Sequence, residues 1–362
     1  MKPDIDLYLV STPRQWWIAC ALASQLQRNS ILLIDNCFNG SDVYAEVTTH
    51  WQDSPFMSIE VLSGKNEWLN LDGFSRVLKK TLEPKIRKQQ IKKLLAENTV
   101  SNFFTSSVRD WLTQFAVHTQ SGMQVSYLDD GIRTYQVDRP KRLSFIAYLH
   151  KKLIHGRWYC APQSYADTTY LKSAYVFHAQ MVNSDIKNLQ VIELKNDWFV
   201  SQGMLNLAQS LLKIYDFEGF VSQQNGRSNC ILAFTKLSIL ERDCPSFNLG
   251  KFKARVLKTV RKAQENGQVI WVKYHPREVC KDIYDISKMV PNVQFIPASI
   301  PFDILISLLV EGDSMLGEIS TVLFDVALRR PDIDVFSVDC LLQNPVLATP
   351  FQKVGVKILE CE

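Results

Sequence analysis

Two short polar segments follow runs of residues that favour β-strands. Asp129, Asp130 and Gly131 follow the run 123–128, and His275 follows the run 268–273. In parallel α/β sheets, the residues just after the strands line the edge where ligands bind. A carboxylate at such an edge can take a proton from a substrate hydroxyl, and a histidine can donate one. These residue types predict a group-transfer site built from two strand ends.

The paired aspartates suit proton transfer. Adjacent carboxylates repel each other, which raises the proton affinity of at least one of them. Gly131 has no side chain, so the backbone can turn there close to a substrate. Asp-Gly is also ordinary turn chemistry, and the segment taken alone fits a plain turn as well.

The histidine lies in a cationic segment. Lys273 and Arg277 flank His275, and Pro276 restricts the backbone after it. A histidine in this setting can neutralise charge that develops on a phosphate leaving group. A lone histidine at a strand end is more often structural, so this interpretation depends on the other motifs.

A Ser-Thr pair precedes the apolar run 322–328. Ser320 or Thr321 is a standard N-cap for a helix over that run. Hydroxyls and free amides at a helix N-terminus also bind phosphate, helped by the helix dipole. Asp303 opens another apolar helix, where it either caps that helix or holds ribose hydroxyls.

Composition narrows the class of protein. The chain has 362 residues, of which 46% are hydrophobic, and a formal net charge of +4. This length allows two domains with separate cores, and the mild charge does not indicate nucleic-acid binding. The 8 cysteines form no Cys-x-x-Cys pair, which argues against a zinc ribbon and favours reduced core residues such as Cys20. With no signal-peptide pattern and no apolar run near the ~20 residues that span a bilayer, we expect a cytoplasmic protein.

Strand-like and helical segments alternate along the chain, as in α/β proteins. We expect two Rossmann-like domains, 1–226 and 227–362, joined by the polar stretch 223–228. Without a Gly-x-Gly-x-x-Gly fingerprint, this organisation favours a nucleotide-sugar transferase of the GT-B type, whose two domains face a cleft, over a dinucleotide enzyme. We also expect a helix over 100–117 and a turn over 312–320. A return of the last helix to the first domain is compatible with this fold.

Three motifs, taken in order, resemble those of the bacterial sialyltransferases. They are Asp-Asp-Gly at 129–131, Lys-x-His-Pro at 273–276 and Ser-Thr at 320–321. The family includes the lipooligosaccharide sialyltransferases and the capsule α-2,8-polysialyltransferases. The opening segment 9–15 also resembles their first strand and loop. The resemblance spans most of the chain, through motifs of two to four residues each.

The resemblance implies an inverting transfer of sialic acid from CMP-sialic acid, which is a substrate, with neither cofactor nor metal. Asp129 would deprotonate the acceptor hydroxyl, with Asp130 second. His275 would stabilise the departing phosphate of CMP, which Ser320 and Thr321 would bind. The domain 1–226 would then lie on the acceptor side, and 227–362 would bind the CMP-sugar.

Three further residues follow from the resemblance. Lys273 is expected beside the donor phosphate, and Pro276 and Asp303 beside the nucleoside. The family's Pro-x-Glu segment is matched by Pro301-Phe302-Asp303, with aspartate in place of glutamate. The aspartate pairs at 4 and 6 and at 332 and 334 precede strands, so we do not assign them to a metal site.

Cations and aromatic rings alternate over 139–159, a mixture that suits an anionic membrane surface or an anionic glycan. We therefore expect a glycan acceptor, which in one interpretation is linked to a lipid. We also expect peripheral contact with the cytoplasmic face of the inner membrane. The basic stretches 85–93 and 251–262 are typical of solvated helix faces.

Other functions stay open at this point. CDP-glycerol polymerases also contain a His-Pro followed by a Ser-containing phosphate site. They typically have a second catalytic histidine. His118 and His178 are available for that role here, but neither lies in a setting that suggests it. A non-catalytic scaffold that keeps the nucleotide-sugar fold is the alternative from another class. RNA binding has no support in the charge or the motifs.

Overall fold

The computed structural model divides into two compact units, unit 1 (Met1–Leu207) and unit 2 (Ala208–Glu362). The residues that it describes are 2–38, 40–64, 72–106, 108–135, 143–161, 170–222, 227–243, 247–275, 278, 282–318, 320–338, 349 and 351–359. The division falls within helix α10 (Gln202–Ile214), upstream of the predicted boundary at 226/227. That boundary stays a prediction, since residues 223–226 of the expected linker lie outside the described ranges.

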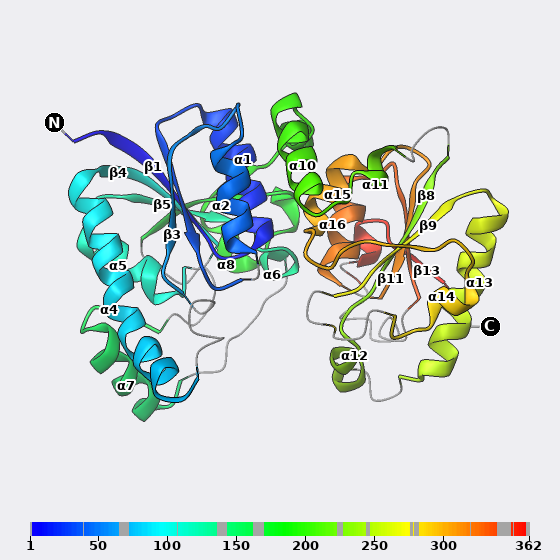
Figure 1. The fold of residues 1–362 in the computed structure, drawn as a ribbon. Helices are drawn as coiled ribbons and strands as arrows, with labels where there is room; N and C mark the ends of the chain where they lie inside the picture. The colour runs from blue at the N-terminus through cyan, green and yellow to red at the C-terminus, as the bar shows by residue number, and fades with distance from the viewer. Residues whose placement is uncertain are drawn as a thin grey trace. The chain divides into compact units, whose positions relative to one another are not determined.

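Unit 1 is built on a parallel sheet of seven strands in the order β3-β2-β1-β4-β5-β6-β7 (Figure 1). The strands are β1 (Asp4–Val10), β2 (Ser30–Asp35), β3 (Phe56–Leu62), β4 (Thr99–Thr105), β5 (Gln124–Leu128), β6 (Leu171–Val176) and β7 (Gln190–Glu193). The helices other than α10 are α1 (Pro13–Leu26), α2 (Ser41–Thr49), α4 (Gly73–Glu97), α5 (Trp111–Thr119), α6 (Ile132–Tyr135), α7 (Phe145–His155), η1 (Ala179–Met181), α8 (Ser184–Lys187) and α9 (Asn196–Phe199). Helices α1 and α2 cover one face of the sheet, and α4 and α5 cover the other.

Local sequence explains the central elements of unit 1. Every residue of β2 is buried, as expected for a parallel strand covered on both faces. Helix α1 begins where Thr12 caps it, because the Thr12 side chain accepts a hydrogen bond from the Gln15 amide and Pro13 suits the first helical position. All residues from Arg14 to Ala23 are buried, so α1 is an internal helix.

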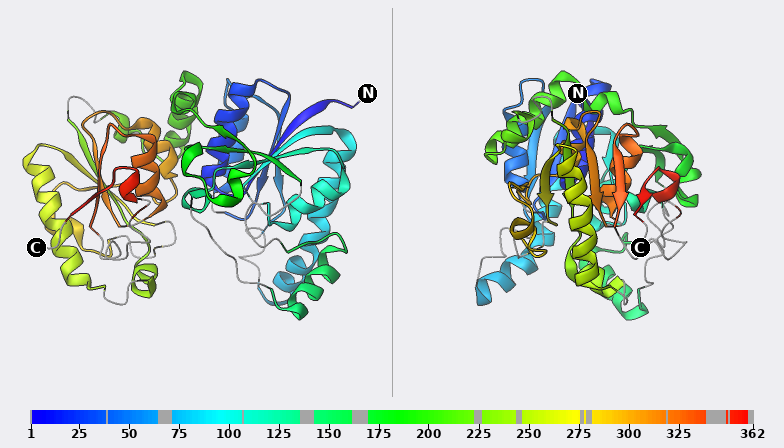
Figure 2. Two further views of the ribbon diagram at one scale, coloured as in Figure 1. Left: turned by 180° about the vertical axis from the view of Figure 1, so that it is seen from behind. Right: turned by 90° about the vertical axis from the view of Figure 1, so that its right-hand side faces the viewer.

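Unit 2 contains a second parallel sheet, with six strands in the order β10-β9-β8-β11-β12-β13. The strands are β8 (Asn229–Ala233), β9 (Val269–Lys273), β10 (Gln294–Phe295), β11 (Ser314–Gly317), β12 (Asp334–Ser337) and β13 (Lys357–Ile358). The helices are α11 (Gly219–Ser222), α12 (Leu237–Asp243), α13 (Leu249–Glu265), α14 (Ile286–Met289), α15 (Phe302–Leu308) and α16 (Thr321–Arg329). Figure 2 shows α13 running along the sheet of this unit.

Both sheets share the strand order of doubly wound nucleotide-binding folds. In each sheet, the chain first adds strands on one side of the first strand and then returns to add the later strands on its other side. The reversal lies between β1 and β4 in unit 1 and between β8 and β11 in unit 2. Ligands of such folds bind at the carboxyl ends of the strands beside this reversal. The predicted α/β class is confirmed.

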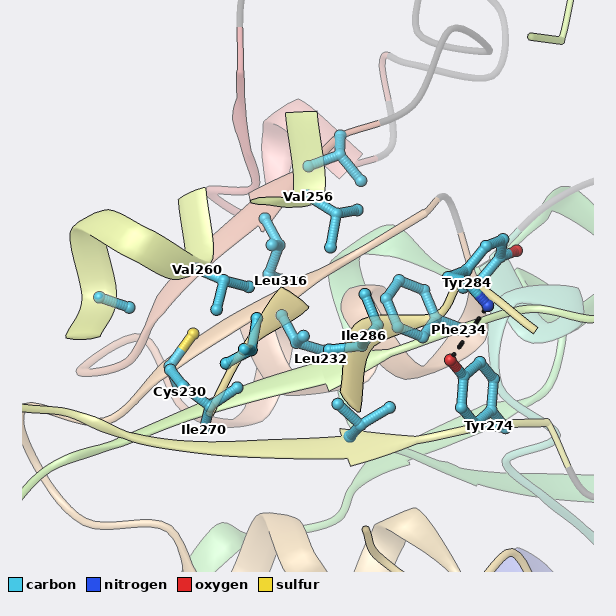
Figure 3. Packing of buried hydrophobic residues seen from close by; sticks show 14 of the residues in the cluster. Cys230, Leu232, Phe234, Val256, Val260, Ile270, Tyr274, Tyr284, Ile286 and Leu316 are labelled. Atoms are coloured by element: carbon cyan, nitrogen blue, oxygen red, sulfur yellow. Dashed lines mark hydrogen bonds between the residues drawn. The ribbon is translucent and has the colours of Figure 1, made fainter. Parts of the chain in front are cut away.

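The core of unit 2 lies between α13 and the sheet (Figure 3). Val256 and Val260 of α13 pack against Ile270 and its neighbours. An aromatic cluster closes the carboxyl end of this core. The Phe234 and Tyr284 ring centroids are 4.7 Å apart, and the Tyr284 amide lies 3.5 Å from the Tyr274 hydroxyl to which it donates.

Two elements differ from the sequence-based expectation. Residues 99–105 form strand β4, where we expected a helix over 100–117, and only Trp111–Thr119 is helical. Residues 314–317 form strand β11, where we expected a turn. Strand β11 has only four residues and is held by neighbours on both sides, so its tertiary setting outweighs its weak local pattern.

The described C-terminal residues belong to unit 2. Strand β13 pairs with β12, and the Phe351 ring packs against Phe324 of α16 at 5.6 Å between centroids. The described residues of the last segment therefore complete the second sheet, and the expected return of the last helix to the first domain stays a prediction.

Candidate functional site

Asp129 follows β5 at the carboxyl edge of the unit 1 sheet and is fully buried. Its Oδ1 accepts hydrogen bonds from Arg14 Nη2 at 2.7 Å and from the Gly131 amide at 2.8 Å. Its Oδ2 accepts from the Tyr135 hydroxyl and from the Phe177 amide, the latter at 3.2 Å. A carboxylate has about four acceptor positions, so these donors occupy all of them. Asp129 therefore organises this edge of the sheet.

Asp130, the next residue, is only half-buried. Its Oδ1 accepts from Gln15 Nε2 at 3.2 Å, and its amide donates to Thr134 Oγ1 at 2.9 Å. Among the described residues, Oδ2 has no hydrogen-bond donor. Burial raises the pKa of Asp130 above its ordinary value, against the opposing effect of the Gln15 hydrogen bond. Of the two acids, Asp130 has the free oxygen and the exposure that contact with a substrate requires.

Two residues of α1 hold both acids, a role that the motifs did not predict. Arg14 forms the ion pair with Asp129, and its guanidinium also lies over the Phe177 ring at 5.4 Å. Gln15 accepts from the Ser11 amide at 2.7 Å while it donates to Asp130. The segment 9–15 had been singled out by resemblance alone, and no pattern in it predicted these partners, which lie 115 residues away.

A second ion-pair cluster lies at the same edge of unit 1. Arg87 of α4 pairs with Asp35, at the end of β2, over 2.7 Å and with Glu83 over 3.1 Å. Asp110 lies nearby, and burial raises its pKa while the Arg87 charge lowers it. The stretch 85–93, expected as a solvated face, thus also contains a buried cation that fixes the end of β2.

In unit 2, three strand ends are in register at the carboxyl edge. Ala233 of β8 pairs with Lys273 of β9 on one side and with Gly317 of β11 on the other. His275 leaves this edge two residues after Lys273, and Ser320 leaves it three residues after Gly317. His275 is half-buried. The histidine motif and the Ser-Thr motif therefore follow strands that end at the same edge of the sheet, on either side of β8.

Lys273 is nearly inaccessible, with 6% of its surface exposed. Its Nζ donates to the carbonyl oxygens of Pro297 and Ala298 at 3.3 and 3.2 Å, which ties the loop after β10 to the end of β9. Burial lowers the Lys273 pKa from 10.5 to about 7. Its expected contact with a donor phosphate stays a prediction.

Ser320 is the N-cap of α16, since its Oγ accepts from the Leu323 amide at 3.3 Å. Thr321 is the first residue of the helix, and both are half-buried. The tight approach of β11 to β8 requires Gly317, because a Cβ there would lie 2.3 Å from the Ala233 carbonyl oxygen. Capping and phosphate binding are compatible here, because the earliest amides of a helix have no partner within it.

Glu318 is a buried acid that no sequence motif indicated. It accepts from the Thr235 amide at 2.8 Å and from the Tyr284 hydroxyl at 3.3 Å. These bonds join the ends of β8 and β11 to the aromatic cluster. Burial, followed by the Glu318 charge, raises the pKa of Tyr284 well above its ordinary value.

Asp303 lies in the first turn of α15 and pairs with buried Arg329 of α16 at 3.2 Å. This ion pair joins the first turn of α15 to the last turn of α16, so the carboxylate has a structural partner. Nucleoside binding by Asp303 stays a prediction, and Pro276 lies outside the described residues.

In the described parts of both units, no three His, Cys, Asp or Glu side chains gather as a metal site would require. Nor is any described helix long and apolar enough to cross a membrane.

Known structures share this fold, although no family model and no curated protein sequence matches the chain. An alpha/beta-galactoside alpha-2,3-sialyltransferase from Photobacterium phosphoreum is 14% identical, with a TM-score of 0.59 over 99% of each chain. A sialyltransferase from Photobacterium damsela is 13% identical, with a TM-score of 0.58 over 99% of this chain and 82% of the other. A UDP-GlcNAc 2-epimerase from Methanocaldococcus jannaschii is 10% identical, with a TM-score of 0.52 over 98% and 88%.

At such low identity, these similarities establish the fold. The chain has the two-domain GT-B fold of nucleotide-sugar enzymes, and this prediction is confirmed. The resemblance to bacterial sialyltransferases, first noted in short motifs, is confirmed at the level of the fold.

Proposed function

We propose that this protein transfers sialic acid from CMP-sialic acid to a bacterial surface glycan, with inversion and without a metal. The observation that supports this most is the edge of unit 2. There β9 and β11 flank β8 in register, so that His275 and the α16 N-terminus with Ser320 leave the sheet together. A cation-capable ring beside a helix N-terminus suits the phosphate of a nucleotide leaving group. The sialyltransferases among the structures of this fold agree with that assignment.

The proposed reaction is a single displacement. The acceptor oxygen attacks the anomeric carbon of sialic acid, while the bond from that carbon to the phosphate oxygen breaks and its electron pair leaves with CMP. His275, the Ser320 hydroxyl and the first amides of α16 offset the charge on CMP. The acceptor proton passes to a carboxylate of the Asp129-Asp130 pair.

Within this proposal we assign the proton to Asp130. The donors on Asp129 leave its carboxylate without a position for a substrate hydroxyl. Asp130 keeps an oxygen without a donor in the described structure, and its raised pKa suits a general base. Asp129 then acts as a positioning residue, through the Gly131 amide and Arg14.

CMP release from CMP-sialic acid by the purified protein, in the presence of EDTA, tests the proposal. Slow hydrolysis of the donor needs no known acceptor. We expect release that resists EDTA and falls at least ~100-fold in His275→Ala, while the exposed His50→Ala control matches wild type. Release from CDP-glycerol but not from CMP-sialic acid would overturn the donor, and loss of activity in EDTA would overturn metal independence.

A further inference from the structure

Helix α7 (Phe145–His155) exposes its apolar side. None of its residues is buried. Phe145, Ile146 and Leu153 are exposed over 74%, 79% and 86% of their surfaces, and Leu149 over 45%. At about 100° per residue, these four positions fall within about one third of the helix circumference. We call these four residues the α7 apolar face.

The opposite side of α7 attaches it to unit 1. Lys88 of α4 donates to the carbonyl oxygens of Ile154 and His155, at 3.2 and 2.8 Å, at the end of the helix. The His155 ring stacks on Trp111 of α5 at 4.9 Å between centroids. The helix is therefore anchored through its polar and aromatic side, and the orientation that exposes the apolar face is fixed by specific contacts.

The surroundings of the apolar face are cationic. Segment 143–161 contains Lys151, Lys152 and Arg157 but no aspartate or glutamate. Lys152 borders the face, and its Nζ lies 4.9 Å from the Tyr148 ring centroid. An apolar helix face bordered by lysines is typical of helices that lie in the interface of a membrane with anionic lipids.

We infer that the α7 apolar face docks on the surface of a bilayer that contains anionic lipids. Phe145, Ile146, Leu149 and Leu153 enter the headgroup region, and the lysines pair with lipid phosphates. The charge pattern disfavours a second copy of the chain as the occupant, because two such faces would bring lysines together with no acid from 143–161 between them. The inference rests on α7 alone and is independent of the proposed reaction.

Sedimentation of the full chain with vesicles tests this inference. Vesicles of phosphatidylcholine with about 30% phosphatidylglycerol are compared with phosphatidylcholine alone. We expect binding to the anionic vesicles that weakens at least ~10-fold in the Ile146→Gln/Leu153→Gln double variant. Both side chains are mostly in solvent, so the variant should melt like wild type. Met57→Gln, at another exposed apolar residue of unit 1, is the matched control and should bind as wild type does.

Three outcomes would overturn the inference. The first is equal binding of wild type and the double variant, and the second is no binding of either. The third is a wild-type dimer in light scattering that the double variant converts to a monomer, which would assign the face to a second copy. Donor hydrolysis without vesicles should be the same in all of these variants, so failure here does not bear on the proposed reaction.

Discussion

Asp129 and Asp130 are adjacent in sequence and differ in what surrounds their carboxylates. The Asp129 carboxylate accepts hydrogen bonds from Arg14 of α1, from the Gly131 amide and from the Phe177 amide. The Asp130 carboxylate accepts from Gln15 and keeps one oxygen without a donor among the described residues. Sequence could place both acids at a strand end. The resemblance implied Asp129 as the base, whereas our proposal assigns the proton to Asp130, because the donors that surround Asp129 come from distant segments that no motif indicated.

Substituting each acid by its amide should separate the two roles. Asp129→Asn leaves the Arg14 guanidinium buried without its counter-charge, so we expect a loss of about 3–5 kcal/mol in unfolding free energy. Asp130→Asn should keep wild-type stability and lose about 10²- to 10⁴-fold in glycosyl transfer. Urea unfolding and a transfer assay measure the two effects. Full transfer activity in a folded Asp130→Asn protein would contradict the assignment.

Lys273 should make stability depend on pH. Its pKa is about 7 in the folded chain against 10.5 in a free side chain, so folding releases a proton between these values. The buried ammonium therefore destabilises the fold below pH 7, and stability rises with pH from about 7 to 10.5.

The slope from this one group is at most about 1.4 kcal/mol per pH unit. We expect Lys273→Met to lose that rise, as measured by urea unfolding at about pH 6.5, 8 and 9.5. The comparison between the two proteins cancels the contributions of all other groups. Parallel pH profiles for wild type and Lys273→Met would show that the lysine is solvated or paired.

At the scale of elements, long periodic segments were predictable and short buried ones were not. The basic stretch 251–262, expected as a helix face, lies within α13, whose apolar residues recur with a clear helical period. Strand β11 has four residues between a Gly-containing turn and Ser320, and sheet neighbours specify it. Because β11 was not predicted, the buried position of Glu318 and the register that brings His275 and Ser320 to one edge could not be predicted either.

Ser320 should contribute to stability as an N-cap as well as to phosphate binding. Ser320→Ala removes the acceptor for the Leu323 amide and should cost about 1 kcal/mol, while Ser320→Gly should cost only about 0.3 kcal/mol. Thermal unfolding monitored by circular dichroism gives both values. If the Ser320→Ala variant is as stable as wild type, another group caps α16.

At the scale of the whole molecule, the candidate residues divide between two units with separate sheets. The acid pair belongs to unit 1, and His275 with Ser320 belongs to unit 2. The class of fold was predictable from the alternation of segments. The strand order was not, because the central strands β4 and β11 were expected as a helix and a turn.

Calorimetric titration of the wild-type protein with CMP and with UMP tests the central claim most directly. We expect CMP to bind at least ~10-fold more tightly than UMP. The CMP affinity should fall at least ~10-fold in His275→Ala, because this residue belongs to the edge of unit 2 to which we assign the donor phosphate. It should stay unchanged in Asp130→Asn, whose carboxylate we assign to the acceptor. No CMP binding, or equal binding of CMP and UMP, would contradict the assignment of a CMP-sugar donor to this fold.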